Sequence, residues 1–172
     1  MDDMLGNLAA RLARLEDLEA IRQLKARYLR ACDLKQVEDV RSCFLPGSVR
    51  IAYQGFPIFT NRDDFVDLFR EMACRGGVYD MHHATNAEIE LSGEGRARGL
   101  WSLNFRTILL ETSSVTHLVV EYEDAYLRQD GRWWISETES RITSFLSEEI
   151  DEAGFAHYTA WGSVPSEPDS KG

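Results

Sequence analysis

Cysteine is scarce in this sequence, and its spacing does not suggest a metal site. The three cysteines of the 172-residue chain, Cys32, Cys43 and Cys74, show no CxxC spacing, so neither a disulfide framework nor a zinc site is predicted. Glycine-rich nucleotide-binding motifs, H-E-x-x-H and G-x-S-x-G are also missing. Nucleotide-binding, zinc-hydrolase and serine-nucleophile functions therefore lack support. Reduced thiols fit a cytoplasmic location best.

Basic residues are fewer than acidic ones. The chain has 19 lysines and arginines against 29 aspartates and glutamates, which gives a net charge of −10. This balance argues against nucleic acid or an anionic membrane as the main partner. Residues 1–25 are charged throughout and contain no continuous apolar stretch, so the sequence predicts neither a signal peptide nor a membrane span. We expect a soluble protein.

Apolar residues recur at helical spacing in the N-terminal half of the chain. Residues 8–32 are typical of one long amphipathic helix. Its apolar positions are Leu8, Leu12, Leu15, Leu18, Ile21, Leu24, Tyr28 and Cys32. A second, short helix is expected over residues 36–44, before Pro46 and Gly47. A third is expected over residues 61–74, where Asn61 can cap the first turn.

The hydrophobic period changes from about four to two in the C-terminal half. One strand is expected earlier, at residues 49–53, and four more follow in series. These four strands cover residues 81–91, 97–111, 116–129 and 132–146. Helices followed by strands predict an α+β fold, with N-terminal helices packed on a curved antiparallel sheet whose concave face forms a pocket. We predict one domain over residues 1–160 and a flexible tail over residues 161–172.

Two adjacent histidines lie in the strand at residues 81–91, and a strand sends neighbouring side chains to opposite faces. Ile89 and Leu91 must be buried. Counting back in twos places His83 on the buried face and His82 on the polar face. The pattern therefore predicts His83 as the inward histidine, either as a catalytic base or as a structural histidine hydrogen-bonded in the core.

Asp33 stands at the end of the first predicted helix and has two possible roles. Capping the next helix is the commoner role of an aspartate at such a junction. Alternatively, it reaches the mouth of the cavity. A histidine base needs an acceptor at its second ring nitrogen, and a carboxylate serves best because it also stabilises the imidazolium. The residues alone leave both roles open.

Several other side chains are candidates for the pocket. Tyr53 lies on the inner face of its strand, where its hydroxyl either polarises a substrate carbonyl or is satisfied within the core. Trp101, Leu103 and Phe105 form one bulky apolar face, with Asn104 on the other. Such a face is usually core, but beside a histidine and a tyrosine it also suits a flat hydrophobic ligand.

Four segments in order carry a resemblance to a known family. LEAIRQLKARYLRACDLKQ, RIAYQGF, MHHATNAEIEL and EYEDAYLRQDGRWWISETESRI are similar to the SnoaL-like family of the nuclear transport factor 2-like superfamily, which includes scytalone dehydratase, bile acid 7α-dehydratase and hexachlorocyclohexane dehydrochlorinase. The likeness covers about residues 15–146 and rests on order and spacing. It implies a cone-shaped α+β barrel, homotrimeric or homodimeric, with a hydrophobic cavity and neither cofactor nor metal.

The resemblance also implies roles for particular residues. Asp33 matches the aspartate that orients the strand histidine, and His83 matches that histidine, the base of an elimination. Tyr53 matches a tyrosine of scytalone dehydratase that helps to hold a catalytic water. The second tyrosine of that pair falls at Cys32, which is a departure from the family pattern.

Two further positions match bile acid 7α-dehydratase, namely Tyr28 and Arg141. By strand parity Arg141 lies with Ile135, Glu137 and Glu139, although a bulge would change its facing, and a surface ion pair is the alternative. A further acidic residue of that enzyme falls at Asn104 or Phe105. The expected catalytic set therefore includes Tyr28 and Arg141, and the expected substrate contacts are Trp101, Leu103, Asn104 and Phe105.

The implied function is a dehydratase-like lyase, in which a histidine abstracts a proton next to a carbonyl of a small hydrophobic cyclic substrate and a leaving group departs. An isomerase of the ketosteroid type or a polyketide cyclase would begin with the same proton abstraction. A non-catalytic module, such as the small subunit of ring-hydroxylating dioxygenases, is the alternative outside enzymes because fold does not fix function.

Overall fold

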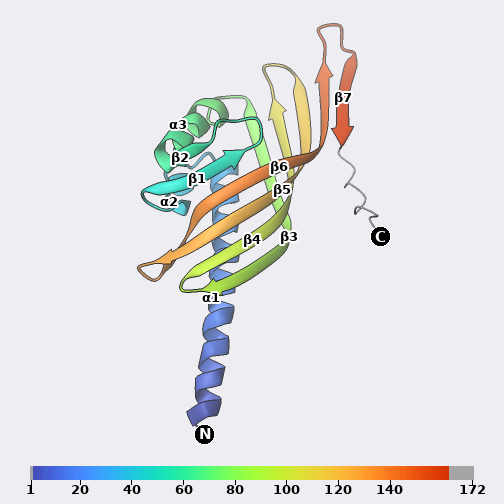
Figure 1. Cartoon of the computed structure of the whole chain (residues 1–172). Helices are drawn as coiled ribbons and strands as arrows, with labels where there is room; N and C mark the ends of the chain where they lie inside the picture. Colours follow the sequence, from blue (N-terminus) through green and yellow to red (C-terminus); the bar gives the residue numbers. More distant parts are fainter. Residues whose placement is uncertain (1, 163–172) are drawn as a thin grey trace, which may run out of the picture.

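The computed structural model describes residues 2–162, with side chains from residue 4 onward (Figure 1). Within that range, helices and strands follow the predicted α+β order. The elements are α1 (Asp2–Asp33), α2 (Val37–Cys43), β1 (Ser48–Tyr53), β2 (Phe59–Asn61), α3 (Arg62–Ala73), β3 (Val78–Gly93), β4 (Arg96–Leu109), β5 (Ser114–Gln129), β6 (Arg132–Ile150) and β7 (Ala156–Gly162).

The strands form one curved, mostly antiparallel sheet in the order β2-β1-β6-β5-β4-β3, with β7 also paired to β6. Strands β3 to β6 make the predicted antiparallel meander, and β1 joins β6 in parallel. The sequence pattern does not predict β2 or β7. Because Trp161 and Gly162 belong to β7, the predicted tail begins two residues too early, and its remaining residues lie outside the described range.

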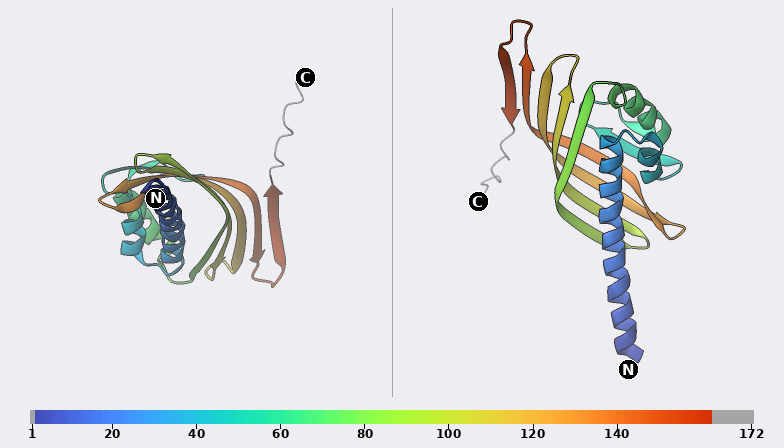
Figure 2. Two further views of the ribbon diagram at one scale, coloured as in Figure 1. Left: turned by 90° about the horizontal axis from the view of Figure 1, so that it is seen from below. Right: turned by 180° about the vertical axis from the view of Figure 1, so that it is seen from behind.

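The helices pack inside the curve of the sheet (Figure 2). Helix α3 begins as predicted, because the Asn61 side chain accepts hydrogen bonds from the backbone N–H groups of Asp63 and Asp64 at 2.8 and 2.9 Å. Helix α2 lacks such a cap, since the side chain of Gln36, the N-cap residue before Val37, makes no hydrogen bond to the first turn. The carboxylate of Asp33 is therefore not used to begin α2.

Helix α1 ends at Asp33 in a turn centred on Lys35, whose φ is 58°. The N–H of Gln36 bonds the carbonyl of Ala31 at 2.9 Å, and the N–H of Lys35 bonds that of Cys32 at 3.2 Å. This is the Schellman pattern, in which glycine is the usual left-handed residue. A lysine there costs about 1 kcal/mol, and the turn directs both Asp33 and Lys35 toward β3.

The apolar stripe of α1 does not stay on one face, which corrects the prediction of a single amphipathic face over residues 8–32. Ile21, Leu24 and Tyr28 are buried against the sheet, whereas Leu8 and Leu15 are exposed. Each step of three residues falls about 60° short of a full helical turn. Three such steps in succession, from Leu15 to Leu24, turn the stripe through roughly half a circle.

Two strands contain bulges that change which side chains face the cavity. In β3 the register shifts between Thr85 and Glu88, opposite Ser102 and Leu100 of β4. Asn86, inside the shift, has a φ of 52°. A bulge adds one residue to one strand and so reverses the alternation of faces beyond it. In β6 a similar shift falls between Ile142 and Ser144.

Among the described residues, no helix combines the length and the apolar content needed to cross a membrane.

Candidate active site

A cavity of about 230 Å³ lies between the concave face of the sheet and helices α1 and α3. Aromatic and aliphatic side chains form most of its wall. They include Phe59, Phe65, Phe69, Leu103, Phe105, Leu118, Val120, Tyr122 and Ile142. Leu103 and Phe105 therefore occupy the predicted position. Polar groups enter the wall at a few points, among them Tyr28, Tyr53, Asp80 and His82.

Asp33 holds His82 through both its ring and its backbone. The Oδ1 atom of Asp33 lies 2.6 Å from Nδ1 of His82, and the backbone N–H of His82 donates to the two carboxylate oxygens at 3.1 and 3.2 Å. The side chains of His82 and Asp33 are 16% and 25% exposed, so both are shielded yet reachable. The structure thus decides between the two roles considered for Asp33 in favour of the histidine contact.

The prediction that His83 faces inward is wrong. His83 is exposed, and its neighbour His82 lines the cavity. Counting back in twos from Ile89 fails because the bulge at Asn86 adds a residue between Ile89 and the histidines. His82 faces Phe105 across the strand pair and His83 faces Asn104, so the inward row runs through His82.

The contact with Asp33 also fixes the tautomer of His82. A carboxylate only accepts hydrogen bonds, so Nδ1 of His82 carries the proton in this contact. In the neutral ring the basic lone pair then belongs to Nε2. The ring of Phe105 packs against His82 with a centroid distance of 4.6 Å, which restrains the plane of the imidazole at the cavity wall. The arrangement orients a base toward the cavity.

Tyr28 and Tyr53 form a pair of hydroxyl groups in the same cavity. Their oxygens lie 2.7 Å apart. Burial raises the pKa of the Tyr28 hydroxyl well above its usual value, and the neighbouring Tyr53 adds to that shift. Burial likewise raises the pKa of Tyr53. Both hydroxyls therefore stay protonated at neutral pH. Because one of them donates to the other, one hydrogen of the pair is left to donate to an oxygen of a ligand.

Cys32 lies at the position where the family pattern has a second tyrosine, and it is a wall residue. Its side chain lines the cavity, but only 4% of the residue is exposed. Burial raises the pKa of its thiol well above the usual range. Cys32 is thus neutral at physiological pH, and the thiolate needed for nucleophilic chemistry is not formed. The structure places Tyr28 beside Tyr53 instead.

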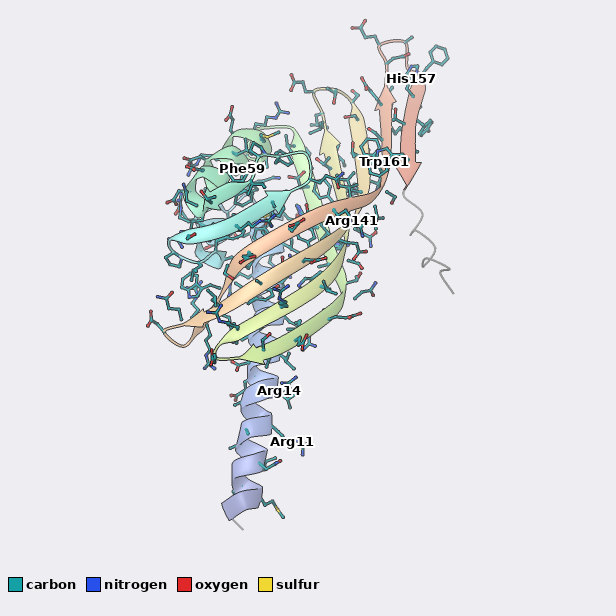
Figure 3. All side chains as sticks on the ribbon, in the orientation of Figure 1. Arg11, Arg14, Phe59, Arg141, His157 and Trp161 are labelled. Carbon is teal, nitrogen blue, oxygen red and sulfur yellow. The ribbon has the colours of Figure 1, made fainter. Side chains whose placement is uncertain are left out.

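Besides His83, three predicted site residues lie outside this cavity. Trp101 is buried behind its wall, and its indole N–H donates to the Tyr126 hydroxyl at 3.0 Å. Asn104 is exposed on the outer face of β4, as strand alternation from Leu103 requires. Arg141 is exposed on β6 (Figure 3), because the register shift between Ile135 and Glu137 reverses the alternation and leaves Arg141 on the outer face.

An ion pair that sequence reasoning missed stands next to the histidine. Asp80 precedes His82 by two residues on β3 and lines the same cavity, and its carboxylate pairs with the ammonium of Lys35. The Asp80 side chain is 8% exposed and that of Lys35 is 22% exposed. The turn at the end of α1, which holds both Asp33 and Lys35, therefore places a second charged contact on the cavity wall beside the base.

The left-handed turn at Lys35 allows a stability prediction. Lys35→Gly and Lys35→Ala both remove the ammonium that pairs with Asp80, but only glycine relieves the left-handed backbone. We expect Lys35→Gly to be about 1 kcal/mol more stable than Lys35→Ala. For a domain of this size that difference is roughly 2–4 °C in Tm. Thermal unfolding of the two variants checks it, and equal Tm values would exclude strain at this turn.

A second buried ion pair supports the cavity from behind. Lys25 of α1 donates to Asp124 of β5 at 2.7 Å, and their side chains are 1% and 0% exposed. Asp124 also accepts from the hydroxyls of Tyr126 and Thr138, each at 2.7 Å. The Lys25 ammonium lies 4.0 Å from the centroid of the Tyr122 ring, which is part of the cavity wall. The network joins the helix to the sheet.

A curved, mostly antiparallel sheet wrapped around N-terminal helices, with a cavity between them, defines the nuclear transport factor 2-like, cystatin-like class of fold. Within the described residues, no group of three or more histidine, cysteine, aspartate or glutamate side chains is placed to hold a metal ion. The SnoaL-like domain family matches residues 13–139, and the chain belongs to that family. This confirms the resemblance that the sequence segments indicate.

Solved structures with the same fold have low sequence identity to this chain. A hexachlorocyclohexane dehydrochlorinase, LinA type 3, of Novosphingobium barchaimii is 19% identical with a TM-score of 0.71, and the match covers 92% of this chain and 99% of that one. A candidate scytalone dehydratase of Novosphingobium aromaticivorans is 18% identical with a TM-score of 0.70, covering 92% and 97%.

A nuclear transport factor 2-like protein with a cystatin-like fold, also from Novosphingobium aromaticivorans, is 23% identical with a TM-score of 0.68 and covers 80% of this chain and 89% of that one. At these identities the matches establish a shared fold.

Proposed function

We propose that this protein is a lyase of the dehydratase type, which removes water or a similarly small leaving group from a hydrophobic cyclic or aromatic molecule. The observation that carries the proposal is the contact of Asp33 with His82, because His82 lines an apolar cavity that also contains the Tyr28–Tyr53 hydroxyl pair. The names of the structural relatives, a dehydrochlorinase and a candidate dehydratase, describe eliminations and support the same reaction class.

In the proposed reaction, Nε2 of His82 takes a proton from a carbon next to a carbonyl. Asp33 keeps Nδ1 protonated and stabilises the imidazolium that forms. The carbonyl oxygen gains negative charge, and a hydroxyl of the Tyr28–Tyr53 pair donates to it. The electrons then form the carbon–carbon double bond as the leaving group departs. A departing hydroxide is protonated by the imidazolium, which returns His82 to its neutral form with release of water.

The open cavity favours catalysis over a purely structural role. An assembly module needs no space inside its sheet, whereas this cavity holds about 230 Å³ with apolar walls, a volume suited to a small cyclic molecule. Its few polar groups converge from α1, β1 and β3, which is the arrangement expected where one substrate must be oriented.

The reaction class is tested by incubating the protein in D₂O with scytalone and with bicyclic β-hydroxy ketones. Mass spectrometry follows both the elimination product and deuterium at the carbon next to the carbonyl. Elimination supports the lyase. Deuterium uptake without elimination would indicate an isomerase or cyclase instead, and absence of both reactions from compounds that bind would contradict the proposal.

The tyrosine pair gives a specific prediction for that assay. Tyr53→Phe removes one hydroxyl that donates to the developing oxyanion, and we expect kcat to fall by about 100-fold. Tyr28→Phe should act in the same direction because the two hydroxyls are hydrogen-bonded to each other. Tyr122→Phe is the matched control, since it removes a hydroxyl from the same cavity and leaves the pair intact. Equal kcat values for Tyr53→Phe and Tyr122→Phe would exclude a role for the pair.

A further inference from the structure

The N-terminal part of α1 leaves the body of the protein as an isolated helix (Figures 1 and 2). The helix first bonds the sheet at Asp17, whose carboxylate accepts from the indole N–H of Trp133 at 2.9 Å and from Arg128 at 3.0 Å. Residues before Asp17 extend past that anchor, and an isolated helix of about this length is only marginally stable in water.

Four leucines form one row along this projecting segment. Leu5, Leu8, Leu12 and Leu15 are 55–63% exposed. Their spacing of three, four and three residues is that of the a and d positions of a heptad repeat. At about 100° per residue, the four side chains fall within an arc of roughly 80°. We call this row the leucine seam.

The leucine seam faces away from the body. Ile21, Leu24 and Tyr28, which bury α1 against the sheet, lie roughly 180° around the helix from the centre of the seam. A second helix laid on the seam would therefore meet no part of the same molecule's sheet. Two copies can place their seams together with both bodies on the outside.

Charges beside the seam favour a second copy in parallel. With Leu5 and Leu12 at a and Leu8 and Leu15 at d, Arg11 takes a g position and Glu16 the following e position. In parallel coiled coils, a g residue of one helix pairs with the next e residue of its partner. Arg11 of each copy therefore meets Glu16 of the other. Both side chains are exposed, and Arg11 points into solvent in Figure 3.

We propose that this protein self-associates through the leucine seam, which pairs with the same seam of a second copy as a short parallel coiled coil. The pairing ends at Glu19, where the next a position carries a charge. Two heptads are few for a coiled coil. Because the helix is already anchored at Asp17, however, association costs less conformational entropy than it would for two free peptides. The interface is independent of the cavity and of the reaction proposed for it.

Sedimentation equilibrium of the full chain over a wide concentration range tests the proposal. L8D/L12D places charges in the seam, and we expect self-association to weaken by roughly 100-fold. A10D/A13D is the matched control, because it adds the same charges to exposed positions outside the seam and should associate like the wild type. Far-UV circular dichroism and Tm verify that the body stays folded. Equal average masses for L8D/L12D and the wild type would overturn the proposal.

Charge reversal tests the parallel register separately. Arg11→Glu and Glu16→Arg each place like charges across the interface and should weaken association several-fold, whereas R11E/E16R restores opposite charges and should restore it. If the double variant associates no better than the single ones, the parallel pairing of Arg11 with Glu16 is wrong.

Discussion

Replacing His82 with alanine should lower kcat for elimination by about 100- to 10,000-fold, while His83→Ala should leave kcat within about twofold of the wild type. His82 is the histidine that contacts Asp33 and lines the cavity, whereas His83 is exposed on the other face of β3. The two variants are matched in size and sequence position. The measurement is steady-state turnover of a substrate identified in the D₂O assay.

Asp33→Asn extends the same prediction to the residue that orients the base. Asparagine is nearly isosteric, but its amide can donate to Nδ1 of His82. The ring proton then lies on Nε2 instead of Nδ1, so Nε2 no longer offers a basic lone pair to the cavity. We expect a loss of kcat of about 1,000-fold, because the wrong tautomer cannot act as the base. A large loss for His83→Ala with full activity of His82→Ala would instead restore the assignment that strand parity predicts.

The choice between the two histidines shows where sequence reasoning about this fold stops. Side chains of β3 alternate between the two faces of the sheet on each side of Asn86, as predicted. Only the extra residue at the bulge reverses which residues face inward. Asn86 does carry a signal, because asparagine tolerates the left-handed conformation better than most residues. An unbroken strand is nevertheless the simpler reading of MHHATNAEIEL. The length of β3, 16 residues, indicates a bulge more strongly than Asn86 does, since strands this long seldom remain regular.

The helices and the meander could be predicted because their causes are local. Helical spacing, the Asn61 cap and the short turns between strands each depend on residues close in sequence. Strand β7 could not be predicted from the sequence because its residues are all exposed and do not alternate between buried and exposed positions. Its partner is the distal part of β6, so the hairpin depends on strand pairing beyond the core.

The charged contacts of the site depend on distant residues and could not be predicted. Lys25 and Asp124 are 99 positions apart, and Lys35 and Asp80 are 45 apart. A lysine in a helix and an aspartate in a strand are ordinary surface residues until the topology places them together. The contact of Asp33 with a histidine is also distant in sequence, but the resemblance to the SnoaL-like family predicts it.

Asp124→Asn should destabilise the protein by about 3–5 kcal/mol, which is the typical cost of leaving one partner of a buried ion pair without its counter-charge. Lys25 is 1% exposed, so its ammonium would be left buried without a counter-charge. At roughly 2–4 °C per kcal/mol for a domain of this size, Tm should fall by about 10 °C. Thermal or urea unfolding measures the loss.

An exposed ion pair in the same sheet supplies the control. Arg50 and Glu139 lie 2.7 Å apart across β1 and β6, but their side chains are 43% and 59% exposed. Glu139→Gln should therefore change stability by less than about 1 kcal/mol, since water screens the pair. If Asp124→Asn were no more destabilising than Glu139→Gln, the buried network could not be what joins α1 to the sheet.

Removing both charges of the buried pair tests separately its effect on stability and its effect on the shape of the cavity wall. Lys25→Met with Asp124→Leu leaves no uncompensated charge, so the double variant should recover most of the stability that Asp124→Asn loses. The Tyr126 and Thr138 hydroxyls, which donate to Asp124, would still need a new acceptor, so full recovery is not expected. Because the Lys25 ammonium lies over the Tyr122 ring, a stable double variant with lowered kcat would assign the pair to positioning the cavity wall. A stable double variant with unchanged kcat would limit the pair to joining the helix to the sheet.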